Sequence, residues 1–136
     1  MIQILSVRTA AAVALVVLGL FVLFHMLVIA GVVPSTVVWG GRLTERSQLV
    51  RAELMSVSLL ILSAAVIFLN ARSLASGDRG ILLTVAIWAV VGLFALNTLG
   101  NIFAKTLFEK MAFTPVTLLL ALLSLRLALG TTASHG

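Results

Sequence analysis

Four long apolar stretches, separated by short polar ones, make up most of this chain. They cover about 9–33, 44–70, 80–104 and 111–129, and an α-helix needs roughly 20 such residues to cross a bilayer. The pattern predicts an all-α fold: a polytopic membrane protein whose single domain, residues 1–136, is a bundle of four transmembrane helices. Because this number of helices is even, both ends of the chain are expected on one side of the membrane.

The first apolar stretch also has features of a signal peptide, because Arg8 precedes it. A signal peptide, however, has an apolar core of only about 7–15 residues, and this stretch is longer and is followed by further apolar stretches. We therefore expect it to be retained as a helix. Pro34 is expected to end that helix, since proline cannot continue the helical hydrogen-bond ladder.

The composition agrees with a membrane location. The chain is 62% hydrophobic and 10% charged, and its mean hydropathy is +1.27, whereas about a quarter of the residues of a soluble domain are charged. The net charge of +5 does not indicate nucleic-acid binding, because the basic residues are scattered among loops and helix ends and form no basic face. They divide almost equally between the two sides, so the positive-inside rule leaves the orientation undetermined.

The chain contains no cysteine and only two histidines. Disulfides, iron–sulfur clusters and cysteine-ligated zinc are therefore excluded. A histidine-based metal site would need several carboxylate partners, which are scarce in this sequence. We expect no metal site and no cofactor.

The connection between the first two helices is the longest polar interruption. Its Trp39 is typical of a residue at the membrane interface, and Gly40-Gly41 permits a tight turn with positive φ. Thr44 is expected to cap the second helix, with Glu45 in the first turn, where a carboxylate is favoured by the helix dipole.

The polar residues of the helices fall at similar depths. His25 lies nine residues before Pro34, about 13 Å along a helix from that end. Glu53 lies near the start of the second helix, while Asn97 and Asn101 lie near the end of the third, all on the same side. The residues expected to form a binding site there are His25, Trp39, Arg42, Arg46, Glu53, Asn97, Asn101, Lys105 and Thr114.

Three interpretations of this polar layer remain open. Polar groups in lipid are costly unless they face one another or a cavity. The layer is therefore a pocket for a small molecule, a hydrogen-bond network that fixes helix packing, or an interface with a partner. Interhelical hydrogen bonds average only ~0.6 kcal/mol, which favours the pocket. Arg42 or Arg46 would then face an anionic head group.

The leading hypothesis for function is binding or movement of a lipid-like or amphiphilic small molecule, with membrane lipid around the protein. The alternative is an accessory subunit that docks a larger membrane protein, or a second copy of the chain, through seams of small residues. A third hypothesis is an intramembrane enzyme that uses His25 and Glu53 as acid and base, which requires these groups within ~3 Å of each other or of one substrate atom. We expect binding rather than catalysis.

Small residues indicate where helices pack. Gly100 and Ala104 predict a close helix approach near the end of the third helix. Arg126, close to the end of the last helix, is expected to extend to the membrane interface. A second seam is expected along one face of the last helix, at Thr114, Thr117, Ala121, Ser124 and Ala128.

Three sequence runs, FHMLVIAGVVPSTVVWGGRL, LNTLGNIFAK and FTPVTLLLALLSLRLAL, carry a resemblance. Their V-W-G-G-R turn, Asn-Thr-x-Gly-Asn step and F-T-P-x-T start of the last helix resemble an uncharacterised family of small bacterial four-helix integral membrane proteins. The resemblance covers most of the chain and implies a multi-pass protein of the bacterial cytoplasmic (inner) membrane. It implies no activity, cofactor or catalytic residue.

Overall fold

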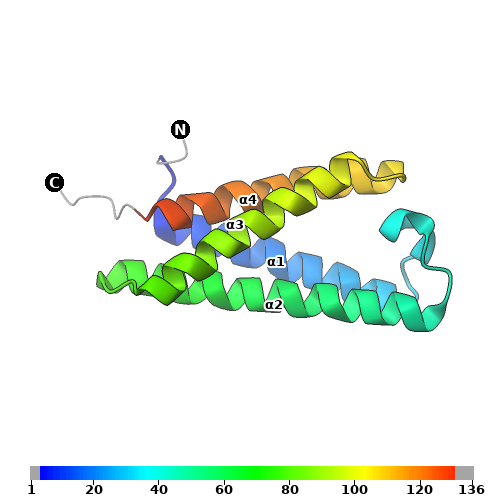
Figure 1. Cartoon of the computed structure of the whole chain (residues 1–136), viewed down its shortest axis with the longest axis horizontal. Coiled ribbons are helices and arrows are strands. Elements are labelled where there is room, and N and C mark those ends of the chain that lie inside the picture. Colours follow the sequence, from blue (N-terminus) through cyan, green and yellow to red (C-terminus); the bar gives the residue numbers. More distant parts are fainter. Residues whose placement is uncertain (1–3, 131–136) are drawn as a thin grey trace.

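The computed structural model describes residues 4–130, which form four long helices and contain no strand (Figure 1). All four are long and apolar enough to cross a membrane when the last is counted with the turn before it, so the predicted four-helix membrane fold is confirmed. The first helix begins and the last helix ends at the same end of the bundle. The helices are α1 (Val7–Ile29), α2 (Arg46–Ser76), α3 (Ile81–Ile102) and α4 (Thr114–Leu129).

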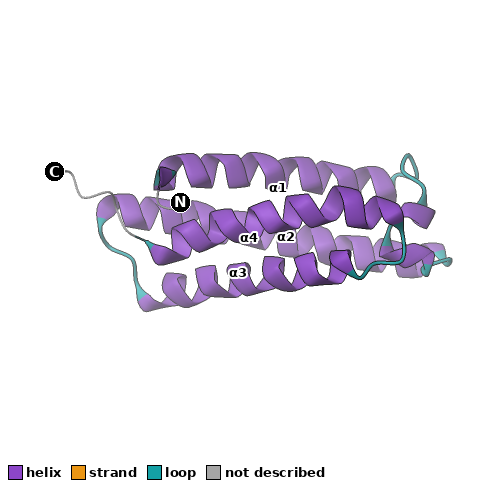
Figure 2. Cartoon of the chain, turned by 90° about the horizontal axis from the view of Figure 1, so that it is seen from above, coloured by secondary structure: helices purple, strands orange, loops and turns teal. Residues whose placement is uncertain are grey.

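The helices form two antiparallel hairpins, α1–α2 and α3–α4. Near the start of α1 the hairpins are close together, and towards the other end α2 and α3 diverge (Figure 1). The view from above shows α4 between α1 and α3 (Figure 2). The core at the centre of the bundle is apolar and includes Leu18, Ile67, Ile87, Phe94, Leu120 and Leu127, all nearly inaccessible to solvent.

The connection between α1 and α2 lies at the diverging end of the hairpins (Figure 1). It contains two 3₁₀ turns, η2 (Ser35–Val37) and η3 (Trp39–Gly41). Val38, between these turns, is buried with Val28 of α1 and Leu49 of α2. The connection is therefore anchored to the α1–α2 hairpin by its own apolar contacts.

α1 ends earlier than expected, at Ile29 rather than near residue 33. Gly31 adopts a φ of +80°, and the Val33 N–H returns to the Leu27 carbonyl at 3.2 Å. The helix is thus closed by a glycine turn, and Pro34 begins the following 3₁₀ turn instead of ending the helix.

α2 begins later and ends later than expected. Glu45 occupies the N-cap position without a capping hydrogen bond from its side chain, so the prediction that Thr44 caps this helix is wrong. α2 continues to Ser76, past the expected end near residue 70, because Gly77 adopts the left-handed conformation (φ +74°) that closes a helix. The Asp78 N–H completes this cap on the Ser73 carbonyl at 3.0 Å.

α4 continues a π-helical segment, η4 (Glu109–Phe113), so this span begins before the expected residue 111. Pro115 is the second residue of α4, two residues after the end of η4. Proline has no N–H, and its ring clashes with the carbonyl four residues earlier in a regular α-helix. The wider π turn lies at this point in the helix, and π turns of this kind are frequent at functional sites.

The predicted seam of small residues on α4 is confirmed for Thr117, Ala121, Ser124 and Ala128, which are all buried. Gly100, by contrast, is exposed and has open space around it, so the close helix approach predicted there does not occur within the described chain. Burial of the small residues is caused by the packing of α4 between α1 and α3.

Arg126 is directed towards the end of the bundle where α1 begins, but it is buried there. Arg126 is only 3% exposed, and its Nε–H donates to the Leu5 carbonyl at 2.7 Å. Near the same end, Arg79 Nη1 donates to the Leu127 and Ala128 carbonyls at 3.0 and 3.2 Å. Arg79 therefore satisfies carbonyl groups in the last turn of α4. Arg126 instead connects α4 with the residue just before the N-cap of α1.

Candidate functional site

Glu53 of α2 is fully buried and joins three segments of the chain. Its Oε2 is hydrogen-bonded to Nδ1 of His25, on α1. Its Oε1 accepts a hydrogen bond from Nε1 of Trp39, in η3, at 2.7 Å. Each carboxylate oxygen thus has a partner from another segment, as a buried carboxylate requires.

The backbone of η3 explains why Trp39 turns inward. Trp39, Gly40 and Gly41 have φ values of +54°, +64° and +70°. A left-handed conformation costs a residue with a Cβ roughly 1–2 kcal/mol, whereas the two glycines adopt it freely. Strained backbone of this kind is concentrated at functional sites.

A second buried carboxylate, Glu109 at the start of η4, binds the same turn. The Gly40 N–H donates to both of its oxygens, at 3.2 Å to Oε1 and 3.1 Å to Oε2. The Thr106 hydroxyl donates to Oε2 at 2.6 Å. Residues Trp39 and Gly40 therefore connect a carboxylate of the α1–α2 hairpin with one of the α3–α4 hairpin.

The sequence analysis did not identify Glu109, although a signal for it exists. Thr106 and Glu109 have the spacing of a capping box, and the Glu109 N–H does donate to the Thr106 hydroxyl at 3.2 Å. Its carboxylate accepts from the Gly40 N–H and the Thr106 hydroxyl rather than from the Thr106 N–H, as a capping box would require. The contact with Gly40 depends on the fold, and no local pattern predicts it.

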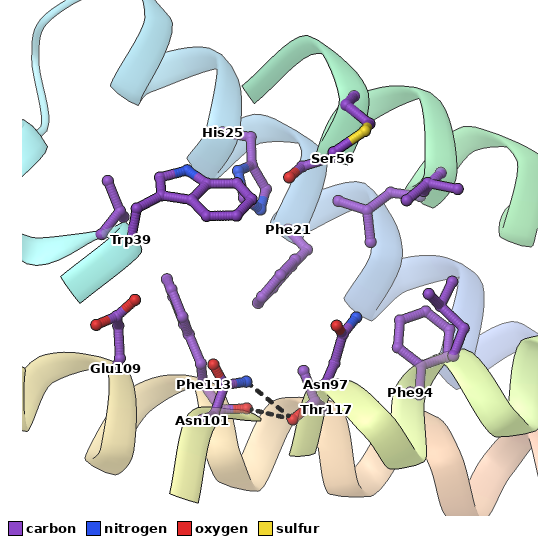
Figure 3. A pocket seen from close by; sticks show the side chains of 15 residues that line it. Phe21, His25, Trp39, Ser56, Phe94, Asn97, Asn101, Glu109, Phe113 and Thr117 are labelled. Carbon is purple, nitrogen blue, oxygen red and sulfur yellow. Dashed lines mark hydrogen bonds between the residues drawn. The ribbon is translucent and has the colours of Figure 1, made fainter. Parts of the chain in front are cut away.

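A cavity of about 290 Å³ lies below this turn, between the two hairpins (Figure 3). Aromatic rings form much of its wall: the Phe21 ring centroid lies 5.3 Å from that of Phe113 and 5.2 Å from that of His25. The residues that line the cavity are Phe21, His25, Val38, Trp39, Met55, Ser56, Leu59, Leu60, Leu93, Phe94, Asn97, Asn101, Glu109, Phe113 and Thr117.

Polar groups from α3 and α4 form one side of the cavity. Asn101 Nδ2 donates to the Thr117 hydroxyl at 3.3 Å, as the dashed lines in Figure 3 show. The Thr98 hydroxyl and that of Thr117 lie 3.1 Å apart, so they extend this network into the helix interface. Asn97 also lines the cavity, and its side chain forms no hydrogen bond with any described residue.

The cavity opens sideways, between α2 and α3. Met55 and Leu59 of α2 line it and are 59% and 40% exposed, and Asn97 of α3 is exposed as well. These residues belong to membrane-spanning helices that diverge at this end of the bundle. An exposed surface at this position faces lipid, so the cavity is accessible from the membrane.

The structure brings some of the expected site residues together and leaves others apart. His25, Trp39, Asn97 and Asn101 line the cavity, and Glu53 lies behind the first two. The remaining expected residues, Arg42, Arg46, Lys105 and Thr114, do not line it.

The basic residues of this set are exposed. Arg42 Nε donates to the Trp39 carbonyl at 3.4 Å, and Arg46 Nη2 donates to the Ile29 carbonyl at the end of α1. Thr114 is half-buried, and its hydroxyl has no hydrogen-bond partner among residues 4–130. The positively charged side chains thus lie around the outside of the connection and not in the cavity.

His25 is the residue of the cavity best suited to proton transfer. Glu53 holds its Nδ1, which fixes the ring, and no described residue hydrogen-bonds its Nε2. Nowhere in the described part of the chain do three or more His, Asp or Glu side chains converge as a metal site requires. The polar chemistry available to a ligand is that of an imidazole, amides, hydroxyls and the Glu109 carboxylate.

Comparison with protein-family models, with curated proteins and with solved structures finds no match to this chain.

Proposed function

We propose that this protein binds an amphiphilic small molecule in the cavity between its two hairpins, within the bacterial cytoplasmic membrane. The observation that carries this proposal is the sideways opening of a cavity with mixed lining between two membrane-spanning helices. Small-molecule sites are typically concave and mostly apolar, with a few converging polar groups. The cavity has this composition.

The arrangement of the lining gives the ligand an orientation. His25, Asn101 and Glu109 offer hydrogen-bonding groups in the interior. Met55 and Leu59 offer apolar contacts at the opening. The polar part of the ligand would bind inside, and its apolar part would extend between α2 and α3 into the lipid.

The experiment that tests this proposal is native mass spectrometry of the detergent-extracted protein, with identification of the molecules that copurify. We expect a defined amphiphile on the wild-type protein and its loss from the Asn101→Ala variant. The matched control is Gln48→Ala, which removes an exposed amide of α2 outside the cavity and should retain the molecule. Bulk phospholipid alone, bound equally by all three proteins, would contradict the proposal.

A second candidate function is proton transfer by His25. The hydrogen bond between His25 and Glu53 meets the requirement that an acid–base pair be in contact. Glu53 is fully buried and both its oxygens are occupied, so only His25 can reach a ligand, and Glu53 would act as a positioning residue. If a copurifying molecule is chemically altered by the wild-type protein but not by His25→Gln, this function gains support; an unaltered molecule contradicts it.

The accessory-subunit hypothesis loses one of its supports. It relied on Ala121 and Ser124 as a docking seam, but both are buried within the chain's own bundle. A partner or a second copy would have to use the lipid-facing surface instead. Gly100, which belongs to the other predicted seam, is exposed on that surface.

A further inference from the structure

Apart from the titratable His25, the cavity wall has one ionisable side chain, and it is acidic. The Glu109 carboxylate lines the cavity, and no Lys or Arg is among the lining residues. Of the basic residues along the connection, Arg42 donates to the carbonyl of Trp39, in the turn beside the cavity, and Arg46 donates to that of Ile29 at the end of α1. An anionic head group placed in this cavity would meet a carboxylate and no Lys or Arg side chain of the described lining.

Glu109 lacks a charged partner. It is 7% exposed, and no described Lys or Arg lies within ion-pair distance of it. Its hydrogen bonds come from the Gly40 N–H and the Thr106 hydroxyl, which are neutral donors. Buried charges in proteins are normally paired, so Glu109 is a carboxylate whose partner the described chain does not supply.

Glu53, the other buried carboxylate, differs from Glu109 because it has a base as a hydrogen-bond partner. It is hydrogen-bonded to His25, so the pair combines one acid with one base. Glu53 therefore has a titratable base beside it. Of the two, Glu109 alone faces the cavity.

The aromatic wall provides a second and independent attraction for a cation. Phe21, Trp39 and Phe113 surround the same space as Glu109 (Figure 3). The face of an aromatic ring attracts a cation within about 6 Å of its centroid, and the attraction is largest where water is excluded. The amide oxygens of Asn97 and Asn101 can accept hydrogen bonds from an ammonium group.

We propose that the polar head of the amphiphile is a cation, a primary amine or a substituted ammonium group, which binds between Glu109 and the aromatic wall. This inference rests on the proposed function, because it names the ligand class of the same cavity. It replaces the anionic head group expected from the sequence, since the arginines behind that expectation do not reach the cavity.

The test compares three ligands with the same chain and different heads: decylamine, decanol and decanoate, titrated into the wild-type protein in nanodiscs of neutral lipid. Calorimetry measures binding, with empty nanodiscs subtracted. We expect decylamine to bind at least roughly tenfold more tightly than decanol, and decanoate more weakly than both; tenfold corresponds to about 1.4 kcal/mol.

The outcomes separate the two proposals. Equal binding of amine and alcohol, or tighter binding of decanoate, would overturn the cationic inference and leave an amphiphile site in place. No specific binding of any of the three ligands would contradict the proposed function itself.

The variant Glu109→Gln tests whether the preference for an amine head over an alcohol head depends on Glu109. The amide has the same shape and can still accept the Gly40 N–H, so the turn should be retained. We expect the amine to lose most of its advantage over the alcohol. Glu45→Gln, which removes an exposed carboxylate outside the cavity, should leave all three affinities as in the wild type. An unchanged amine preference in Glu109→Gln would contradict the assignment.

Discussion

At the scale of single residues, Trp39 links the connection to the bundle. Its indole N–H satisfies one oxygen of a fully buried carboxylate, and its left-handed backbone directs the next N–H to Glu109. The residue expected to anchor at the membrane interface is thus a structural contact and part of the cavity wall. Its role follows from hydrogen bonding as well as from its amphipathic ring.

We predict that Trp39→Phe destabilises the protein by about 1–3 kcal/mol, because it leaves one oxygen of a buried carboxylate without a donor. Thermal unfolding in detergent, followed by far-UV circular dichroism, measures this change. Trp88→Phe is the control, since Trp88 of α3 is 46% exposed and its replacement should have little effect. Equal midpoints for the two variants would contradict a stabilising role for the indole hydrogen bond.

The sequence predicts part of this site because depth along a helix follows from counting residues. Counting predicts His25, Glu53, Asn97 and Asn101 at one level. In the structure His25, Asn97 and Asn101 line one cavity, and Glu53 lies behind His25. Counting residues along a helix cannot predict where the side chains of the connecting segments point. Arg42 and Arg46 donate to the carbonyls of Trp39 and Ile29, while Glu109 reaches the Gly40 N–H from the start of η4.

At the scale of elements, the helices were predictable and their ends were less so. The length of an apolar stretch predicts a membrane-spanning helix. The residue at which that helix ends depends on which residue adopts a left-handed conformation. Gly31 closes α1 before Pro34, and Gly77 closes α2 after a longer run than expected. The π turn before Pro115 extends from Glu109 to Phe113. The hydrophobic pattern of the sequence does not predict it, because it carries no information on the packing around these residues.

The Trp39–Gly41 turn is expected to be sensitive to a Cβ. In Gly41→Ala the new Cβ would lie 3.4 Å from the Thr36 carbonyl oxygen, at a φ of +70°. We predict a loss of stability of roughly 1–2 kcal/mol, the cost of a left-handed residue with a Cβ.

Gly92→Ala is the opposite case, because Gly92 is helical and has open space around its Cβ position. Alanine is favoured over glycine in a helix by up to ~1 kcal/mol. Midpoints of thermal unfolding should therefore move in opposite directions for the two variants. A shift in the same direction would mean that the left-handed turn does not set the stability of the connection.

At the scale of the whole molecule, two hairpins that meet at one end and diverge at the other create a site open to lipid. The closed end is held by apolar packing, by Arg79 on carbonyls at the end of α4 and by Arg126 on the Leu5 carbonyl before α1. At the open end, the two hairpins are connected through Trp39 and Gly40. The all-α architecture follows from the sequence, but the divergence that makes the cavity does not, since it depends on how four similar apolar helices pack.

Filling the cavity should abolish binding without unfolding the protein. Ser56 of α2 is half-buried and lines the cavity, whereas Ser58 is exposed and does not. We predict that Ser56→Phe lowers the affinity for an amphiphile by at least roughly tenfold, because the ring occupies the space of the ligand. Ser58→Phe adds the same ring on the outer face and should bind as the wild type does.

The measurement that tests the account most directly uses Trp39 as a reporter from within the cavity. In the Trp88→Phe background Trp39 is the remaining tryptophan, and an amphiphile with a brominated chain quenches its emission on contact. We predict saturable quenching that Ser56→Phe removes and Ser58→Phe retains. Quenching that rises without saturation, to the same extent in all three proteins, would show partition into bulk lipid only and would contradict an amphiphile-binding cavity.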